Sequence, residues 1–500
     1  MDLDSKSREP PLEHLTTADQ AAQDADDLVH LGHKEELTRK FSPWSMFFLA
    51  FSVLGTWNTF AQGLSSGLNN GGPIDILWGL VVVTICNLCV ALSMGELCSS
   101  MPTALEFILS MRLLYDPDWA PASKGWVQFL LYVGITVFLT LVNQVSCRRD
   151  IILPMFNNFV GVCYIGLFFV FSLALLISVG TKDHLHYKSA GFVFGQWINE
   201  TGWSDGVTWF MGLIQAAYGL TAFDAAVHMV EEIPAPRKNV PKVIWLSVVM
   251  GAVTGFIFMV VSLFCAQDLQ TLTDGPIGIP FVDLMNQVVG LKGTTVLLSF
   301  FVFNGMGQGT SLMTTGSRLT WGFARDGGLP WSNYFAHVDK TWKVPVRALW
   351  LQGAIIAIVG VLYTFSSFVL GAILGVSTIA LTISYGIPIA TLLWVGRDKL
   401  PPGGQFSLGR FGPLLNWVSI IYCIITSIFF FFPSTPNPVA SDMNYSIAVF
   451  GIMIIIAVGF WFVKGHQSYL GFTTGNNEIA AVIDAQPETK SPGNTKSESV

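Results

Sequence analysis

Residues 218–234 read YGLTAFDAAVHMVEEIP and place a carboxylate, Asp224, deep inside an apolar stretch. No charged residue occurs between Gly206 and Phe223. An ionisable side chain at the centre of a bilayer costs about 2.5–3.5 kcal/mol on insertion scales and faces the protein interior or a watery path. Asp224 is therefore the first candidate for a functional residue.

The composition places this stretch in a membrane. Of the 500 residues, 52% are hydrophobic and only 12% are charged, with a mean hydropathy of +0.55. A soluble domain carries about 25% charged residues. We therefore predict an all-α polytopic protein whose partner is the lipid bilayer. The net charge of −7 mostly reflects acidic tails, and no region is basic enough to predict nucleic-acid binding. The seven cysteines lie in or at the ends of apolar stretches, so no disulfide framework, metal or cofactor is expected.

A membrane-crossing helix needs about 20 mostly apolar residues. Eleven stretches meet this requirement, after an uncharged run is divided near Ser366 and Ser367. The predicted spans are 42–68, 76–95, 126–147, 151–181, 206–232, 243–267, 294–317, 348–366, 368–396, 412–433 and 443–463.

Lysines and arginines between the spans predict the cytoplasmic side, where such residues accumulate. This places a disordered cytoplasmic tail at 1–40, a transmembrane domain at 41–472 and a second disordered cytoplasmic tail at 473–500. The alternation of sides fails once. Residues 96–125 must cross from the inside to the outside, yet their longest apolar piece, 104–115, is too short to span. Either it is a re-entrant half-helix or a crossing has been lost.

Two of the spans contain interruptions. Span 42–68 is interrupted at 55–58, and span 206–232 contains the poor helix former sequence Gly-Leu-Thr at 219–221. Transporters built from inverted repeats often open each repeat with such a broken helix. The second repeat then has five spans and the first only four. The deficit coincides with the failed alternation of sides.

Several longer strings resemble fungal amino acid/choline permeases of the amino acid–polyamine–organocation superfamily. They are GLTAFDAAVHMVEEIP at 219–234, TTGSRLTWGFARDGGLP at 314–330, NETGW at 199–203, GGP at 71–73 and MNY at 443–445. The resemblance extends over residues 41–472. It implies a LeuT-like inverted-repeat fold with twelve spans as a rule. It also implies transport of choline, GABA, other amino acids or polyamines at the fungal plasma membrane, in many members coupled to protons.

The chain departs from the family pattern after residues 96–104. Here Leu105, Glu106 and Phe107 follow, where the family continues with Gly-Gly-Gln, an aromatic residue and a full third span. We therefore expect about eleven clear spans, with the third missing or truncated. An error in the gene model and a genuine short variant are both open explanations.

The two interruptions supply the candidate substrate site, because exposed backbone at a broken helix can bind a substrate or an ion. The predicted substrate-binding residues are Gly55, Thr56, Trp57, Tyr218, Gly219, Thr221, Phe223 and Asp224. For Gly55, the alternative is a glycine that only permits close helix packing.

Asp224 and His228 lie four residues apart and share a helix face, so they are the candidate proton-coupling pair. A packed, hydrogen-bonded histidine is the alternative for His228. Glu231 and Glu232 are interpreted as ion-paired at the cytoplasmic helix end, with Arg237 or Lys238 as partners.

Three aromatic residues of the two interrupted spans, Trp57, Tyr218 and Phe223, are candidates for a wall that attracts an ammonium group. Packing is the alternative role for each ring. Thr314 and Thr315 are weaker candidates for an ion site against the first span. Asn199 begins a glycosylation acceptor, Asn-Glu-Thr, in a loop predicted to lie outside.

The sequence thus predicts a secondary active transporter of a small amine or amino acid, driven by protons and working by alternating access. Three alternatives stay open: an exporter of a small nitrogenous metabolite, a nutrient sensor that does not transport, and an inactive truncated transporter. An enzyme is not expected, since no nucleophile–base or metal-ligand constellation occurs. The sequence predicts no oligomeric state.

Overall fold

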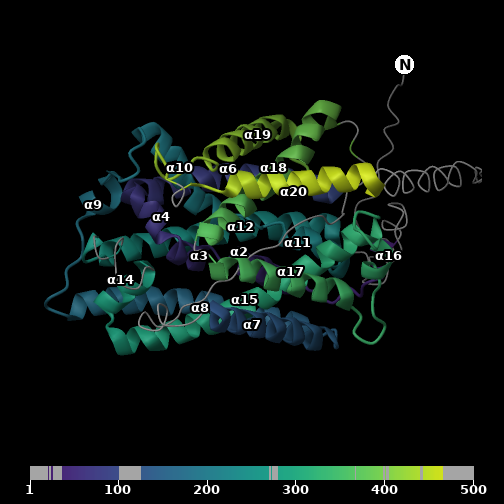
Figure 1. Cartoon of the computed structure of the whole chain (residues 1–500), viewed down its shortest axis with the longest axis horizontal. Helices are drawn as coiled ribbons and strands as arrows, with labels where there is room; N and C mark the ends of the chain where they lie inside the picture. Colours follow the sequence, from purple (N-terminus) through teal and green to yellow (C-terminus); the bar gives the residue numbers. More distant parts are fainter. Residues whose placement is uncertain are drawn as a thin grey trace, which may run out of the picture.

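The computed structural model describes residues 21, 24–25, 36–100, 125–269, 272, 280–365, 368–397, 400, 405–439 and 443–465. In this part of the chain the regular secondary structure is helical, apart from one short β-ladder in which Asn70 pairs with Asn199 and an isolated bridge between Asp339 and Val344. Each predicted span contains helix, so the prediction of an all-α membrane protein is confirmed (Figure 1).

The first half of the bundle opens with a helix that is broken at Gly55. Its elements are α2 (Pro43–Leu54), α3 (Thr56–Gln62), α4 (Leu64–Asn69), β1 (Asn70–Gly71), α5 (Gly72–Ile74), η1 (Asp75–Gly79), α6 (Leu80–Ser100), α7 (Gly125–Cys147), α8 (Ile152–Thr181), α9 (Ala190–Gly195) and β2 (Ile198–Asn199).

The second half also opens with a broken helix, as expected for the LeuT-like inverted-repeat fold. Its elements are α10 (Asp205–Gly219), α11 (Ala225–His228), η2 (Val230–Glu232), α12 (Pro236–Cys265), α14 (Pro280–Val288), α15 (Leu291–Arg325), α16 (Ser332–Phe335), α17 (Val346–Phe365) and α18 (Phe368–Val395). Beyond it lie η4 (Gly409–Phe411), α19 (Gly412–Phe429), α20 (Ser446–Phe460) and η5 (Trp461–Gly465).

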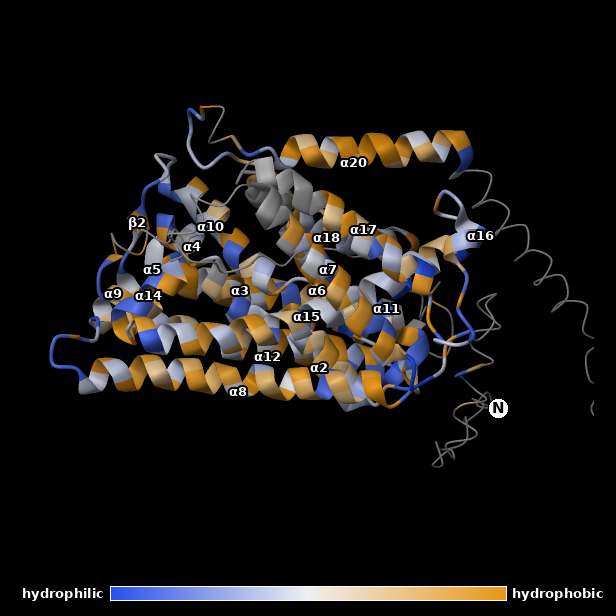
Figure 2. Cartoon of the chain, turned by 60° about the horizontal axis from the view of Figure 1, so that its bottom comes forward, coloured by the Kyte–Doolittle hydropathy of each residue, from blue (hydrophilic) through white to orange (hydrophobic). Residues whose placement is uncertain are grey.

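The distribution of hydrophobic residues marks the position of the bilayer. Figure 2 shows hydrophilic residues gathered at the two ends of the bundle and hydrophobic residues along the outer helices α8 and α20. Six of the described helices are both long and apolar enough to cross a membrane. They are Gly72–Met94, Ile152–Thr181, Pro236–Cys265, Gly375–Val395, Gly409–Phe429 and Ser446–Gly465. The two broken helices fail this length criterion because their halves are short.

Helix packing brings the two halves together around the broken helices. Helix α12 packs along α6 and α2, α7 packs along α17, and α2 packs along α8. Helices α9 and α14 lie at one end of the bundle and α16 lies at the opposite end (Figure 1). The basic loops predict that the α16 end is cytoplasmic and the α9 end is outer. The core of the bundle therefore surrounds the residues next to Gly55 and Asp224.

Helices α6 and α7 run in the same direction. Near the end of α6, Glu96 accepts hydrogen bonds from Arg397 and from the backbone N–H of Leu408, in the basic region after α18. Cys147, the last residue of α7, lies beside Arg318 near the cytoplasmic end of α15. The end of α6 and the start of α7 are thus at opposite ends of the bundle, as the failed alternation of sides predicts. Residues 101–124, where the missing third span is predicted, lie outside the described residues.

Part of the predicted N-terminal tail contacts the bundle. Asp24 accepts a hydrogen bond from the backbone N–H of Ala235 at 2.9 Å and lies 3.5 Å from Arg39 in an ion pair. Lys40, assigned to the tail by the predicted boundary, is buried in an ion pair with Glu232. The remainder of that tail and all of residues 473–500 lie outside the described residues.

Candidate functional site

The first break lies at Gly55, within the interruption predicted at 55–58. Gly55 ends α2 with φ = 58° and ψ = 25°, a left-handed conformation that glycine adopts without the steric penalty of a side chain. Its N–H donates to the carbonyl of Phe51 at 3.2 Å, and the chain resumes as α3 at Thr56. The break therefore redirects the helix axis in the middle of the bundle.

Several buried polar atoms next to this break have no hydrogen-bond partner among the described residues. Asn58 Nδ2 donates to Gln308 Oε1 of α15 at 2.8 Å, which joins α3 to α15. The remaining polar atoms of that pair, Asn58 Oδ1 and Gln308 Nε2, are unpartnered, as are Thr56 Oγ1 and Trp57 Nε1. Buried polar groups are normally hydrogen-bonded, so these atoms have bonding capacity that an ordered water or a ligand can satisfy.

The second break separates α10 from α11 over residues 220–224. Ala222 has φ = 70°, and Leu220 ends α10 with its N–H shared among the carbonyls of the last turn. Gly219 allows the two broken helices to approach closely, because a Cβ there would lie 2.2 Å from Cε1 of Phe60 in α3. Thr221 donates its hydroxyl to the carbonyl of Ala217. The predicted interruption is therefore present in the fold.

Asp224 follows this break and is held by two side chains. Its Oδ2 lies 2.9 Å from Nε2 of His228, and its Oδ1 accepts a hydrogen bond from the hydroxyl of Tyr385 at 2.6 Å. The side chain is only 3% exposed, and both partners are also buried. His228 Nδ1 has no partner in the described part of the chain. The predicted Asp224–His228 pair is thus in contact, and its proton-bearing atoms are shielded from bulk water.

Tyr385 was not among the residues predicted from the sequence. It lies in the middle of α18, and its ring packs on Phe223 with centroids 4.9 Å apart. Its only signal in the sequence is a phenol within the long uncharged run of 348–396, which does not reveal its partner.

Glu231 and Glu232 are ion-paired, although their partners come from distant segments. Glu232 is fully buried, with Arg318 Nε at 2.7 Å and Lys40 Nζ at 2.9 Å, the latter in poor hydrogen-bond geometry. Glu231 accepts from Arg325 at 2.9 Å. The sequence interpretation named Arg237 and Lys238 because they are close in sequence. The fold instead brings the start of α2 and the end of α15 to η2.

The predicted aromatic wall is divided between two clusters. Trp57 stacks on Tyr164 with centroids 5.2 Å apart and also packs against rings of α8, α12 and α15. Phe223 packs on Tyr385 instead. Tyr218 is half-buried near the end of α10. The break at Gly55 directs Trp57 toward α8, so Trp57 and Phe223 do not belong to one wall.

Thr314 and Thr315 contribute to helix packing. The hydroxyl of Thr314 accepts from Asn143 Nδ2 at 2.6 Å and donates to the carbonyl of Thr310, which joins α15 to α7. Thr315 donates to the carbonyl of Ser311. The polar residue of α15 that bonds to Asn58 at the first break is Gln308, nearly two turns earlier, and the sequence analysis missed it.

Asn199 lies in β2 at the outer end of the bundle. Its Nδ2 donates to the carbonyl of Trp203 and to Asp205 Oδ1, each at 2.9 Å, and its Oδ1 accepts from Thr201. The hydrogen bond from Asn199, and a second one from Trp197, lower the pKa of Asp205. A glycan on Asn199 would replace one of the two Nδ2 bonds.

The chain is similar to known permeases over most of its length. A family model described as amino acid permease matches residues 104–458. The chain is 27% identical to the choline transporter of Saccharomyces cerevisiae, in an alignment covering 96% of this chain and 89% of that protein. It is 26% identical to the GABA-specific permease of the same organism, with 89% and 84% covered. A solved structure of MhsT in complex with L-phenylalanine aligns at 13% identity with a TM-score of 0.46, covering 77% of this chain and 97% of that chain.

The family match includes the predicted break at 219–221 and the string that contains Asp224, His228 and Glu232. It identifies a multi-pass membrane permease rather than an enzyme and agrees with the resemblance found in the sequence. The chain belongs to the amino acid permease family.

Proposed function

We propose that this protein is a secondary active transporter that carries a small amine or amino acid across the plasma membrane by alternating access. The observation that supports this most strongly is the pair of broken helices in contact. Helix α3 packs on α10, and α2 packs on α11, so both breaks lie in the same region of the core. Broken helices at the bilayer midplane provide polar backbone and side-chain groups for a substrate.

The unpartnered groups near Gly55 suit a substrate carboxylate. Gln308 Nε2 and the hydroxyl of Thr56 can donate hydrogen bonds there, and neither atom has a partner among the described residues. The relatives named for choline and GABA show that small amines and amino acids are within the range of the family. We therefore assign Gly55, Thr56, Asn58 and Gln308 to substrate binding.

Asp224 has a different role in this proposal. Both of its carboxylate oxygens are already engaged, one by Tyr385 and one by His228. A carboxylate and an imidazole in contact can share or exchange a proton near neutral pH. The proposal therefore assigns proton coupling, rather than substrate binding, to Asp224 and His228.

In this proposal, the ion cluster around Glu232 closes the cytoplasmic end. Lys40 precedes α2, Glu232 ends η2 and Arg318 belongs to α15. The ion pairs of the cluster therefore connect the start of α2, η2 and α15. Opening to the cytoplasm requires these elements to separate. Alternating access would therefore involve disruption of the Lys40–Glu232–Arg318 cluster.

The proposal predicts proton-driven uptake by the purified full-length chain in liposomes. With an acidic outer buffer, radiolabelled GABA or choline should accumulate inside several-fold above the level without a gradient, and a protonophore should abolish the difference. Uptake that is equal with and without the pH gradient would rule out proton coupling. Substrate binding without transport would identify a sensor. Transport of the substrate only from the cytoplasmic side to the outer side would identify an exporter.

A second prediction concerns Gln308. Replacing Gln308 by alanine should raise the substrate concentration for half-maximal uptake at least tenfold, because one donor to a charged substrate group contributes about 1.5–3 kcal/mol. Gln352→Ala is the matched control. Gln352 is also a buried glutamine, but it bonds Thr320 between α17 and α15. We expect Gln352→Ala to lower the yield of folded protein without changing the half-maximal concentration; equal values for both variants would contradict the assignment.

A further inference from the structure

Asp75, the first residue of η1, is a buried carboxylate outside the site described above. It is 2% exposed, and neither carboxylate oxygen has a hydrogen-bond partner in the described part of the chain. Burying such a group without compensation is strongly unfavourable. Asp75 is therefore buried by the helix packing, although the described residues provide no hydrogen-bond donor to its carboxylate.

Glycines make room for this carboxylate. A Cβ at Gly212 of α10 would lie 2.0 Å from Asp75 Oδ2, and a Cβ at Gly79 would lie 3.2 Å from Oδ1. The backbone carbonyl oxygen of Asn70 lies 2.4 Å from the same Gly212 Cβ position, so two acceptors lie close to Gly212. The close approach of η1 and α10 thus brings acceptors together without a matching donor.

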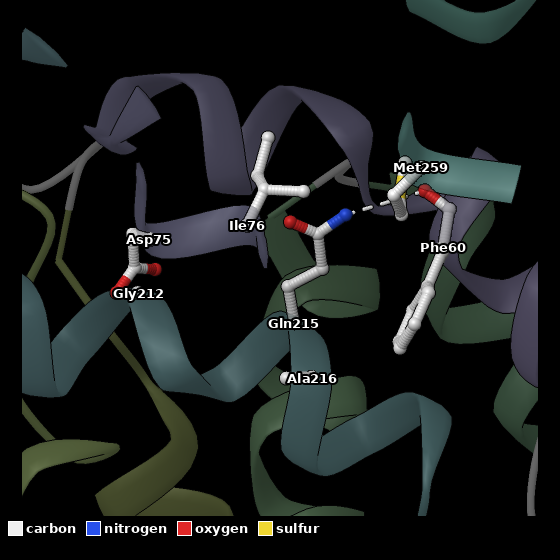
Figure 3. Close-up of a pocket in the computed structure, with 7 residues that line it drawn as sticks. All are labelled: Phe60, Asp75, Ile76, Gly212, Gln215, Ala216 and Met259. Atoms are coloured by element: carbon white, nitrogen blue, oxygen red, sulfur yellow. Dashed lines mark hydrogen bonds between the residues drawn. The ribbon is translucent and has the colours of Figure 1, made fainter. Parts of the chain in front are cut away.

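The carboxylate borders a narrow gap between α3, η1, α10 and α12, and this gap would have to widen to admit a ligand (Figure 3). Gln215 of α10 lines the same gap. Its Nε2 donates to the carbonyl of Phe60 at 3.3 Å, while its Oε1 is on the other side of the amide and has no partner among the described residues. The remaining lining side chains, among them Ile76 and Met259, are uncharged and apolar.

The free acceptors define the chemistry of a ligand. Asp75 supplies a negative charge when it is ionised, and Gln215 Oε1 supplies a neutral acceptor, so a cation that carries N–H donors fits both. A primary ammonium group has three such donors. A quaternary ammonium has none and is instead recognised by several aromatic faces, whereas Phe60 is the one aromatic residue that lines this gap in the described structure.

We propose that Asp75 and Gln215 form a subsite for the primary ammonium group of a small amine or amino acid. The inference rests on the proposed transport function and deepens it by naming the substrate class. The subsite lies on the outer side of the breaks, since η1 directly follows the β1–α5 segment that pairs with the outer loop at Asn199. Its walls include α3 and α10, one half of each broken helix, so an ammonium bound there contacts both.

The test compares Asp75→Asn with wild type in two assays. GABA and putrescine serve as primary ammonium probes, and choline serves as the quaternary probe. In liposomes, Asp75→Asn should raise the half-maximal concentration for the primary amines at least tenfold and leave that for choline unchanged. In detergent, the primary amines should raise the Tm of wild type, and this rise should be lost in Asp75→Asn.

The matched control is Asp283→Asn. Asp283 of α14 is a buried acid with one unpartnered oxygen, but it does not line the gap. The Asp283→Asn variant should retain the wild-type response to all three probes. If Asp75→Asn does not fold, Gln215→Met removes the second acceptor and should raise the half-maximal concentration for primary amines about threefold, as expected for one neutral hydrogen bond.

The outcomes separate the subsite from the transport function. Transport of GABA or putrescine with an unchanged half-maximal concentration in Asp75→Asn overturns the subsite and leaves the transport function standing. An Asp75-dependent rise in Tm without flux supports the subsite and overturns transport. A wild-type protein that shows neither a Tm shift nor uptake with either primary amine overturns the subsite.

Discussion

Asp224→Asn is expected to reduce proton-driven uptake about a hundredfold while leaving the protein folded. Asparagine keeps the size of the side chain but neither gains nor releases a proton. It also weakens two hydrogen bonds to a buried charged group, each worth about 1.5–3 kcal/mol. The loss follows from the geometry, in which Tyr385 and His228 contact opposite oxygens of Asp224 at 2.6 and 2.9 Å. Initial rates of uptake in liposomes, with and without an acidic outer buffer, measure this effect.

A matched acid at the surface provides the control for Asp224. Asp150 pairs with Lys343 at 2.8 Å, and both side chains are well exposed, so the pair contributes only about 0–1 kcal/mol. Asp150→Asn should therefore transport like wild type. Tyr385→Phe should give a smaller loss than Asp224→Asn, because it removes one hydrogen bond and leaves the titrating pair. Wild-type gradient-driven uptake by Asp224→Asn would disprove the coupling role.

Glu232→Gln is expected to have the largest effect on stability, lowering the free energy of unfolding by about 3–5 kcal/mol. Glu232 is 0% exposed and compensates two buried cations, Arg318 and Lys40. Without this carboxylate, both positive charges remain in a low-dielectric interior with no Glu232 charge to balance them. Thermal denaturation in detergent, followed by the fraction of monodisperse protein, measures the loss.

Two further variants separate a loss of charge balance from a loss of packing. The double variant Glu232→Gln/Arg318→Met removes one charge of each sign and should be more stable than Glu232→Gln alone. Glu231→Gln affects the more exposed pair with Arg325 and should cost less.

The same variants report on the cytoplasmic closure. Cys147 is fully buried, with its sulfur 3.8 Å from the guanidinium of Arg318. If the ion cluster holds this end closed, a thiol reagent should modify Cys147 faster in folded Glu232→Gln than in wild type. An unchanged rate of modification would show that the cluster does not control access.

The sequence alone determined the features that depend on local composition. Uncharged runs of sufficient length identify the helices, and Gly55 and the Gly-Leu-Thr string at 219–221 identify the breaks. The side of each basic loop also located the conflict between residues 96 and 125, and the parallel directions of α6 and α7 agree with it. These inferences work because hydropathy and backbone preference are properties of short segments.

Only the tertiary structure decided which side chains meet. Asn58 is hydrogen-bonded to Gln308, 250 positions away in the sequence, and Asp224 is hydrogen-bonded to Tyr385, 161 positions away. Apolar membrane helices carry little local information about their neighbours, since every face is hydrophobic and packing alone selects the partner. For this reason Trp57, expected beside Phe223, packs toward α8, and Glu232 pairs with Lys40 and Arg318 rather than with its neighbours in sequence. Composition thus defined the helices and their breaks, whereas close packing of three or more helices defined the site between them.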